Sequence, residues 1–205
     1  VKNNGYTGKR GKAKNKNKSI YSSLQRARKK IFDYTIANDW ELWGTLTLDK
    51  TKINRYDLDV VQKKLSQYLW NVKKIKYPNL TWLIVPEQHK DKAWHFHLLL
   101  SGLPYNELRD IGKTYKNTNQ KMYNWVDYEN KFGFNSFIDI SIVSIADKHK
   151  IANYITKYIT KDFCKLRYNK KKYWSSKGLG QPNKTNTLLN DKEFQKIIKL
   201  KKSNS

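Results

Sequence analysis

The stretch AWHFHLLL, residues 93–100, places two histidines on either side of one apolar residue. Side chains alternate between the faces of a β-strand, so His95 and His97 would share one face while Phe96 enters the opposite layer. Glu87 ends the preceding apolar run, and a hairpin through residues 88–93 would bring its carboxylate beside both imidazoles. The stretch therefore predicts an antiparallel strand pair that carries a metal site. The alternative is a pair of surface histidines on an edge strand.

The predicted ligands of this site are Glu87, His95 and His97. Two nitrogens and one carboxylate leave coordination positions open, which suits Mg²⁺ or Mn²⁺ that also holds a phosphate. A closed zinc site would need a fourth ligand, for which His89 is the nearby candidate, but we expect His89 to be a loop residue. His149 is expected to be structural or solvent-facing. The single cysteine excludes a disulfide within the chain.

A second motif, NYITKYITK at residues 153–161, spaces two tyrosines four residues apart. On a helix over residues 146–161 both phenols would share one face. A phenol can attack a phosphodiester and conserve the bond energy as phosphotyrosine, and a lysine one turn away can stabilise the phenolate. The alternative is that both tyrosines pack in a core or groove. The predicted nucleophiles and their assisting lysines are Tyr154, Tyr158, Lys157 and Lys161.

The spacing of apolar residues predicts the remaining elements. Apolar positions three or four apart favour helices, and alternation favours strands. The predicted helices span residues 19–38, with Ser19 or Ser22 as N-cap, then 57–76, 104–115, 146–161 and 188–200. The predicted strands span residues 40–48, 80–85, 94–100 and 137–143.

The composition indicates a polyanionic partner. Lys and Arg number 42 against 17 Asp and Glu, which gives a net charge of +25, and 14% of the residues are aromatic. Basic surfaces bind phosphates and interleaved aromatics stack on bases, although ribosomal and membrane-surface proteins are also basic. No apolar run approaches the roughly 18 residues of a membrane span, and neither a signal peptide nor a GxxxxGK loop is present. We therefore expect a cytoplasmic protein with no membrane partner and no nucleotide cofactor.

These motifs resemble those of a known family. HFHLLL is similar to the His-hydrophobic-His signature of the HUH endonucleases. YITKYITK is similar to the two-tyrosine motif of rolling-circle replication initiators (Rep proteins) from small single-stranded DNA phages and related plasmids. WGTLTLD at 43–49 and YWSSKGLGQP at 173–182 resemble further family segments, and Glu87 precedes His95 by the spacing found in viral Rep proteins, where the acid helps bind the metal.

The resemblance implies an α+β fold: a single domain with a central antiparallel sheet of about five strands, HUH/Rep-like and related to ferredoxin-like folds, flanked by helices, with the tyrosine helix packed across it. It implies site-specific nicking and rejoining of single-stranded DNA through a 5′-phosphotyrosine, which starts and ends rolling-circle replication of a plasmid, phage or mobile element in a bacterial host. The implied partners are single-stranded or hairpin origin DNA and the host helicase and polymerase.

The predicted layout is a basic flexible arm at 1–18, the endonuclease domain at 19–182 and a basic C-terminal helix or tail at 183–205. Two alternatives remain: an HUH transposase or relaxase, and a non-catalytic basic DNA-binding protein. The motif leaves open which tyrosine attacks first, because each has a lysine three residues on. The residues predicted to contact nucleic acid are Thr45, Thr47, Lys9, Arg10, Arg28, Lys172, Trp174 and Lys177.

Overall fold

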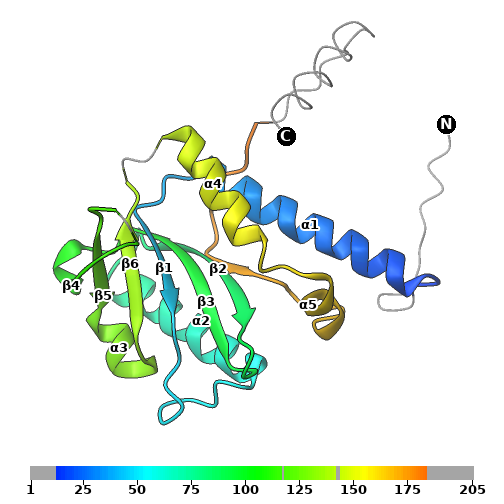
Figure 1. Cartoon of the computed structure of the whole chain (residues 1–205), viewed down its shortest axis with the longest axis horizontal. Coiled ribbons are helices and arrows are strands. Elements are labelled where there is room, and N and C mark those ends of the chain that lie inside the picture. Colours follow the sequence, from blue (N-terminus) through cyan, green and yellow to red (C-terminus); the bar gives the residue numbers. More distant parts are fainter. Residues whose placement is uncertain (1–12, 117, 142–143, 184–205) are drawn as a thin grey trace, which may run out of the picture.

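The computed structural model describes residues 13–116, 118–141 and 144–183. Its centre is a seven-stranded sheet in the order β4-β5-β6-β1-β3-β2-β7, with antiparallel neighbours throughout (Figure 1). The strands are β1 (Leu42–Leu46), β2 (Thr81–Gln88), β3 (Trp94–Ser101), β4 (Leu108–Thr114), β5 (Lys121–Trp125), β6 (Asn135–Asp139) and β7 (Trp174–Ser175). The predicted α+β class is confirmed, although the sheet has seven strands rather than about five.

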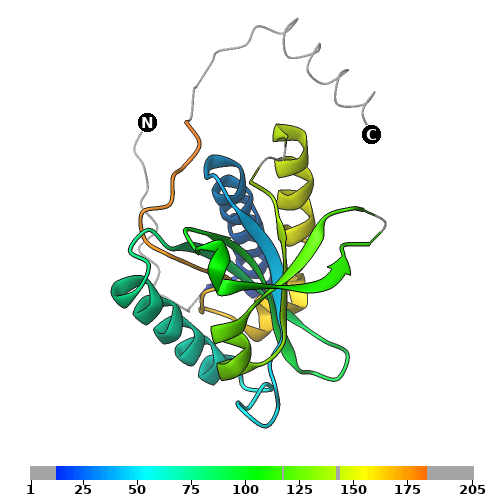
Figure 2. The same cartoon turned by 90° about the vertical axis from the view of Figure 1, so that its left-hand side faces the viewer.

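Helices cover both faces of this sheet (Figures 1 and 2). On one face α1 (Lys16–Ala37) lies beside α4 (Ile145–Thr156) and the short α5 (Lys161–Leu166). On the other face lie α2 (Leu58–Ile75) and α3 (Val126–Phe132), which meet through an edge-to-face contact between Tyr68 and Phe132. A 3-10 turn, η1 (Tyr105–Glu107), leads into β4.

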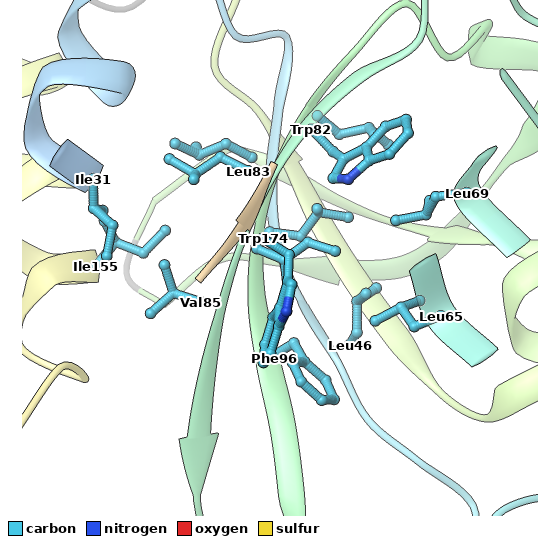
Figure 3. Close-up of a cluster of buried hydrophobic side chains, with 14 of the residues drawn as sticks. Ile31, Leu46, Leu65, Leu69, Trp82, Leu83, Val85, Phe96, Ile155 and Trp174 are labelled. Atoms are coloured by element: carbon cyan, nitrogen blue, oxygen red, sulfur yellow. The ribbon is translucent and has the colours of Figure 1, made fainter. Parts of the chain in front are cut away.

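The alternation of β3 divides the core into two layers (Figure 3). Phe96 is fully buried on the side of α2, next to Leu46 and Leu65. On the opposite side Val85 of β2 faces Ile31 of α1 and Ile155 of α4. Because the histidines of β3 alternate with Phe96, they lie on the face that α1 and α4 cover.

The two long helices begin at capping residues. Asp57 caps α2, since its carboxylate accepts hydrogen bonds from the N–H groups of Asp59 and Val60, and this confirms the predicted helix at 57–76. For α1 the predicted N-cap, Ser19 or Ser22, is wrong. The helix begins at Lys16 because the side chain of Asn15 accepts from the N–H of Lys18 and starts the first turn earlier.

The central strands lie close to their predicted positions. β1 falls within the predicted 40–48, and β2 and β3 form the predicted antiparallel pair. β6 begins two residues before the predicted 137–143 and ends at Asp139. Residues 142–143 lie outside the described part of the chain.

The helix predicted at 104–115 is wrong. Leu108, Ile111 and Tyr115 follow a helical spacing, but the segment forms η1 and then β4, which pairs with β5. A register shift between Asp110 and Thr114 lets an irregular strand adopt this spacing. Gly112 sits in this shift at φ 68°, a left-handed conformation that favours glycine.

The single helix predicted at 146–161 is also wrong. α4 ends at Thr156, a turn follows, and α5 begins at Lys161 with Thr160 as its N-cap. The side chain of Thr160 accepts from the N–H of Phe163, which starts a new helix instead of continuing the old one. Tyr158 therefore lies in the turn between two helices, and Tyr154 and Tyr158 do not share one helical face.

The helix predicted at 188–200, most of the basic arm at 1–18 and most of the tail at 183–205 lie outside the described residues. Within the described ranges no helix combines the length and apolarity that crossing a membrane requires.

Candidate active site

Three side chains from the β2–β3 hairpin converge on one point, and we call them the Glu-His-His cluster: Glu87, His95 and His97. Glu87 lies opposite His95 in the strand register. One carboxylate oxygen of Glu87, Oε2, is 2.6 Å from Nε2 of His95 and 2.8 Å from Nε2 of His97. The structure thus brings together the three residues predicted as metal ligands, with their ligand atoms within 4.8 Å of one another.

The environment of the cluster suits a cation. Both histidines are buried, and burial lowers the pKa of His95 and lowers that of His97 to about 4. The imidazoles are therefore neutral near pH 7, and neutral imidazole is the form that binds a metal. Two neutral nitrogens beside one carboxylate fit a divalent cation that keeps open positions. His89 is an exposed loop residue, as predicted, but its ring centroid lies 3.9 Å from that of His95.

Both tyrosines of the second motif contact His97. The ring of Tyr158 stacks on His97 with centroids 3.8 Å apart and an interplanar angle of 11°. The ring of Tyr154, in the last turn of α4, meets His97 edge to face at 6.1 Å. The two phenol rings lie 5.4 Å apart. The broken helix therefore still delivers both phenols to the Glu-His-His cluster.

The phenol of Tyr158 is held in its neutral form in the absence of a cation. Burial raises its pKa above the ordinary value, and the adjacent phenol of Tyr154 and the carboxylate of Glu87 raise it further. A cation at the cluster would oppose these effects, because a nearby positive charge favours a phenolate.

Lysines surround Tyr154. The ammonium of Lys157 lies 5.6 Å from the centroid of its ring, and that of Lys116, from the β4–β5 hairpin, lies 6.0 Å from it. The spacing of the motif predicts Lys157 at this site. Nothing in the sequence pattern points to Lys116, because the spacing of its segment predicts a helix in place of the hairpin. Lys161 begins α5, but its side chain is outside the described part of the structure.

Two hollows flank the tyrosines. A cleft of about 550 Å³ lies on the side of Glu87 and Tyr158 and extends to Lys157 and Phe163. A smaller cavity of about 140 Å³ lies on the side of His97 and Tyr154. The paired phenols stand between the two.

Three of the predicted DNA contacts lie near or beyond the edge of this site. Thr45 pairs with His97 across β1 and β3 and lines the smaller cavity. Thr47 is exposed just after β1, and Lys177 is exposed after β7. Lys9 and Arg10 lie outside the described residues.

The other three have internal roles, so we no longer propose them as DNA contacts. Nε of Arg28 donates to the carbonyl of Ile159 at 2.9 Å. The ammonium of Lys172 is buried and donates to the carbonyls of Arg167 and Lys170. The indole of Trp174 is buried against Phe96.

His149 lies away from the cluster. It is exposed on α4, and its ring meets Phe32 of α1 edge to face at 5.4 Å.

Comparison with known proteins agrees with this geometry. The family model described as replication-associated protein ORF2 matches residues 41–163 of the 205 in the chain. The chain belongs to this family. The resemblance to HUH-type rolling-circle replication initiators is thereby confirmed, and the matched segment of this replication-associated protein contains the whole Glu-His-His cluster and both tyrosines.

Two curated relatives of this replication-associated protein are viral. Initiator protein NS1 of Hamster parvovirus H1 is 31% identical over 85 residues, and initiator protein NS1 of Murine minute virus (strain MVM prototype) is 29% identical over 85 residues. Each match covers 42% of this chain and 12% of the relative, so the chain spans a small part of the length of either. No solved structure gave a significant match.

Proposed function

We propose that this protein nicks and rejoins single-stranded DNA with a tyrosine nucleophile and a divalent metal, Mg²⁺ or Mn²⁺, and so initiates rolling-circle replication of a plasmid, phage or mobile element. The observation that carries the proposal is the contact of two phenols with His97, which itself belongs to the Glu-His-His cluster. Membership of a family of replication-associated proteins supports the biological setting.

The side chains supply each requirement of the reaction. The Glu-His-His cluster would hold a cation, which polarises the scissile phosphate. A phenol oxygen attacks phosphorus and forms a phosphotyrosine bond, while the bond from phosphorus to the 3′ oxygen breaks. The phenol loses its proton, and the departing oxygen gains one and leaves as a free 3′-OH. The bond energy stays in the phosphotyrosine, so a later attack by a 3′-OH rejoins the strand.

Two phenols in contact suit an enzyme that must cut twice. While one tyrosine holds the 5′ end of the first cut, the other can attack the regenerated site one replication round later. Lys157, beside Tyr154, would stabilise a phenolate and the charge that develops at phosphorus. The net charge of +25 would attract the DNA backbone. We further propose that the substrate is a single-stranded or hairpin origin and that a host helicase and polymerase extend the 3′-OH.

Covalent capture tests the proposal. With single-stranded oligonucleotides that tile the candidate origin and with Mn²⁺, the wild type should form a protein–DNA adduct that survives denaturing electrophoresis. Chelation should abolish the adduct, and so should the double variant Tyr154→Phe/Tyr158→Phe, because no phenol remains near the cluster. Tyr21→Phe is the matched control, since Tyr21 is exposed on α1 and should leave the adduct unchanged.

An adduct that persists in the double variant would overturn the assignment of the nucleophile. An adduct that forms equally in excess chelator would overturn the role of the metal. Peptide mapping of the adduct from each single variant identifies the tyrosine that attacks first.

A further inference from the structure

The smaller cavity next to the tyrosines has a composition that the nicking reaction does not require, and we call it the hairpin cavity. Its volume is about 140 Å³. Strands β1 and β6 form its floor, and the β4–β5 hairpin forms one wall. The residues used below are Trp43, Thr45, Tyr115, Lys116, Met122 and Ser136.

Aromatic rings line the hairpin cavity. The indole of Trp43 lies 6.0 Å from the ring of Tyr115 and 5.3 Å from that of Tyr154, both edge to face. Met122 adds an apolar surface. The ammonium of Lys116 lies 4.9 Å from the centroid of Tyr115, at the side of the cavity formed by the hairpin. Flat apolar walls with a cation at the rim are the combination that binds a base and its phosphate.

The hairpin cavity also contains polar groups suited to the edge of a base. The side chains of Thr45 and Ser136 lie on the same face of the sheet as His97. The indole nitrogen of Trp43 is buried and has no hydrogen-bond acceptor among the described residues. Buried donors nearly always have a partner, so an unpaired one at a cavity wall indicates an acceptor that arrives with a ligand.

We propose that the hairpin cavity receives one unpaired base of the DNA strand, the base next to the phosphate that is cut. This rests on the proposed nicking function, because His97 and Tyr154 line the cavity as well as the reaction site. The volume of about 140 Å³ is below the roughly 300–1,000 Å³ of ordinary ligand pockets and suits one flat ring. A base seated there fixes the position of the adjoining phosphate at the phenols, so the cavity determines where the strand is cut.

Nuclear magnetic resonance of the metal-free protein tests this without any cutting. The indole N–H signal of Trp43 is assigned by its loss in Trp43→Phe. The tetranucleotide d(T)4 should shift this signal, and a tetramer of abasic sugar-phosphate units should not, because only the first carries bases. The indole signal of Trp70, on α2 on the opposite face of the sheet, is the internal control and should stay in place with both ligands.

Affinity provides a second measurement that spares the packed indole. Tyr115→Ala should weaken d(T)4 binding on the order of tenfold, as expected for the loss of one stacking ring, and should leave abasic tetramer binding unchanged. Tyr21→Ala, on exposed α1, should change neither.

Equal shifts of the Trp43 signal with both tetramers, or no shift with d(T)4, would overturn the base site. Equal weakening of both ligands by Tyr115→Ala would also overturn it. These results are separable from the nicking proposal: a protein that forms the tyrosine adduct but shows no base-dependent shift refutes only the cavity. A base-dependent shift without an adduct refutes only the nuclease.

Discussion

The rings of His97 and Tyr158 lie nearly parallel, with centroids 3.8 Å apart, although one residue is in a central strand and the other is in a turn between two helices. Tyr154 meets the same imidazole edge to face from the last turn of α4. One histidine thus joins the predicted metal ligands to both predicted nucleophiles. The end of α4 at Thr156 is what allows the second phenol to stack rather than to follow the helix.

We predict that this stack depends on the ring of Tyr158 and not on its hydroxyl. Tyr158→Phe should unfold at nearly the same urea concentration as the wild type, because the phenyl ring still covers His97. Tyr158→Ala should lose about 0.5–1.5 kcal/mol of unfolding free energy for the aromatic pair, in addition to the loss of buried area. Urea unfolding followed by circular dichroism measures both. Equal destabilisation by the two variants would mean that the hydroxyl, not the stack, secures the turn.

We predict that Mn²⁺ binds to the Glu-His-His cluster in the absence of DNA. Glu87→Gln and His97→Ala should each weaken Mn²⁺ binding at least about tenfold, because each removes a ligand and the loss of a group that merely orients a ligand already costs that much at other metal sites. Titration followed by electron paramagnetic resonance counts free Mn²⁺ directly. His149→Ala is the matched control, since this histidine is exposed and contacts Phe32 instead. Similar weakening in all three variants would contradict the assignment.

The part of the site that alternation controls could be predicted from the sequence. Period-two spacing determines that His95 and His97 share a face with each other and not with Phe96, and a short hairpin determines that Glu87 lies opposite His95. Asp57 likewise marks the start of α2 because its side chain has a local partner. In each case the deciding interaction lies within a few residues of the chain.

Features that depend on distant partners could not be predicted in this way. Leu108 and Ile111 have helical spacing, and only pairing with β5 makes their segment a strand. The apolar and β-branched residues from Ile155 to Thr160 suit one helix or two, and the side chain of Thr160 decides by capping a new one. The sequence alone therefore does not reveal the hairpin cavity, because the segment that forms its wall has the spacing of a helix.

The ion pairs of Asp59 give an acid-dependent contribution to stability. Hydrogen bonds from Lys170 and Arg167 lower the pKa of Asp59 below its usual value, so the folded state favours the carboxylate. The stabilisation is complete above the unfolded pKa, near 3.8, and is lost as the pH falls through the lower folded value. Because solvent screens these partly exposed pairs, we expect Asp59→Asn to be only about 1 kcal/mol less stable than the wild type at pH 7 and to approach the stability of the wild type at pH 2.

Thermal unfolding of both proteins from pH 7 to pH 2 measures this difference. A difference in Tm that stays constant through the acid range would show that Asp59 acts by packing or capping rather than by its charge.

We predict finally that the residue between the two histidines is the main local determinant of their position. Phe96 is fully buried beside Leu46 and Leu65, so Phe96→Ala should cost about 3–5 kcal/mol of unfolding free energy through lost contacts and the cavity it leaves. Phe96→Leu keeps most of the volume and should cost much less. Phe134→Ala is the matched control, because that ring is 51% exposed and its removal should change stability by less than about 0.5 kcal/mol.

The same variants should rank in the same order for Mn²⁺ affinity, since a strand that loses its anchor on the α2 side holds its imidazoles less firmly on the other. Urea unfolding and Mn²⁺ titration on one set of proteins test both halves of the argument. A Phe96→Ala protein that is strongly destabilised, yet still folded at about 10 °C and binding Mn²⁺ as tightly as the wild type, would show that the imidazoles are held by Glu87 and Tyr158 alone.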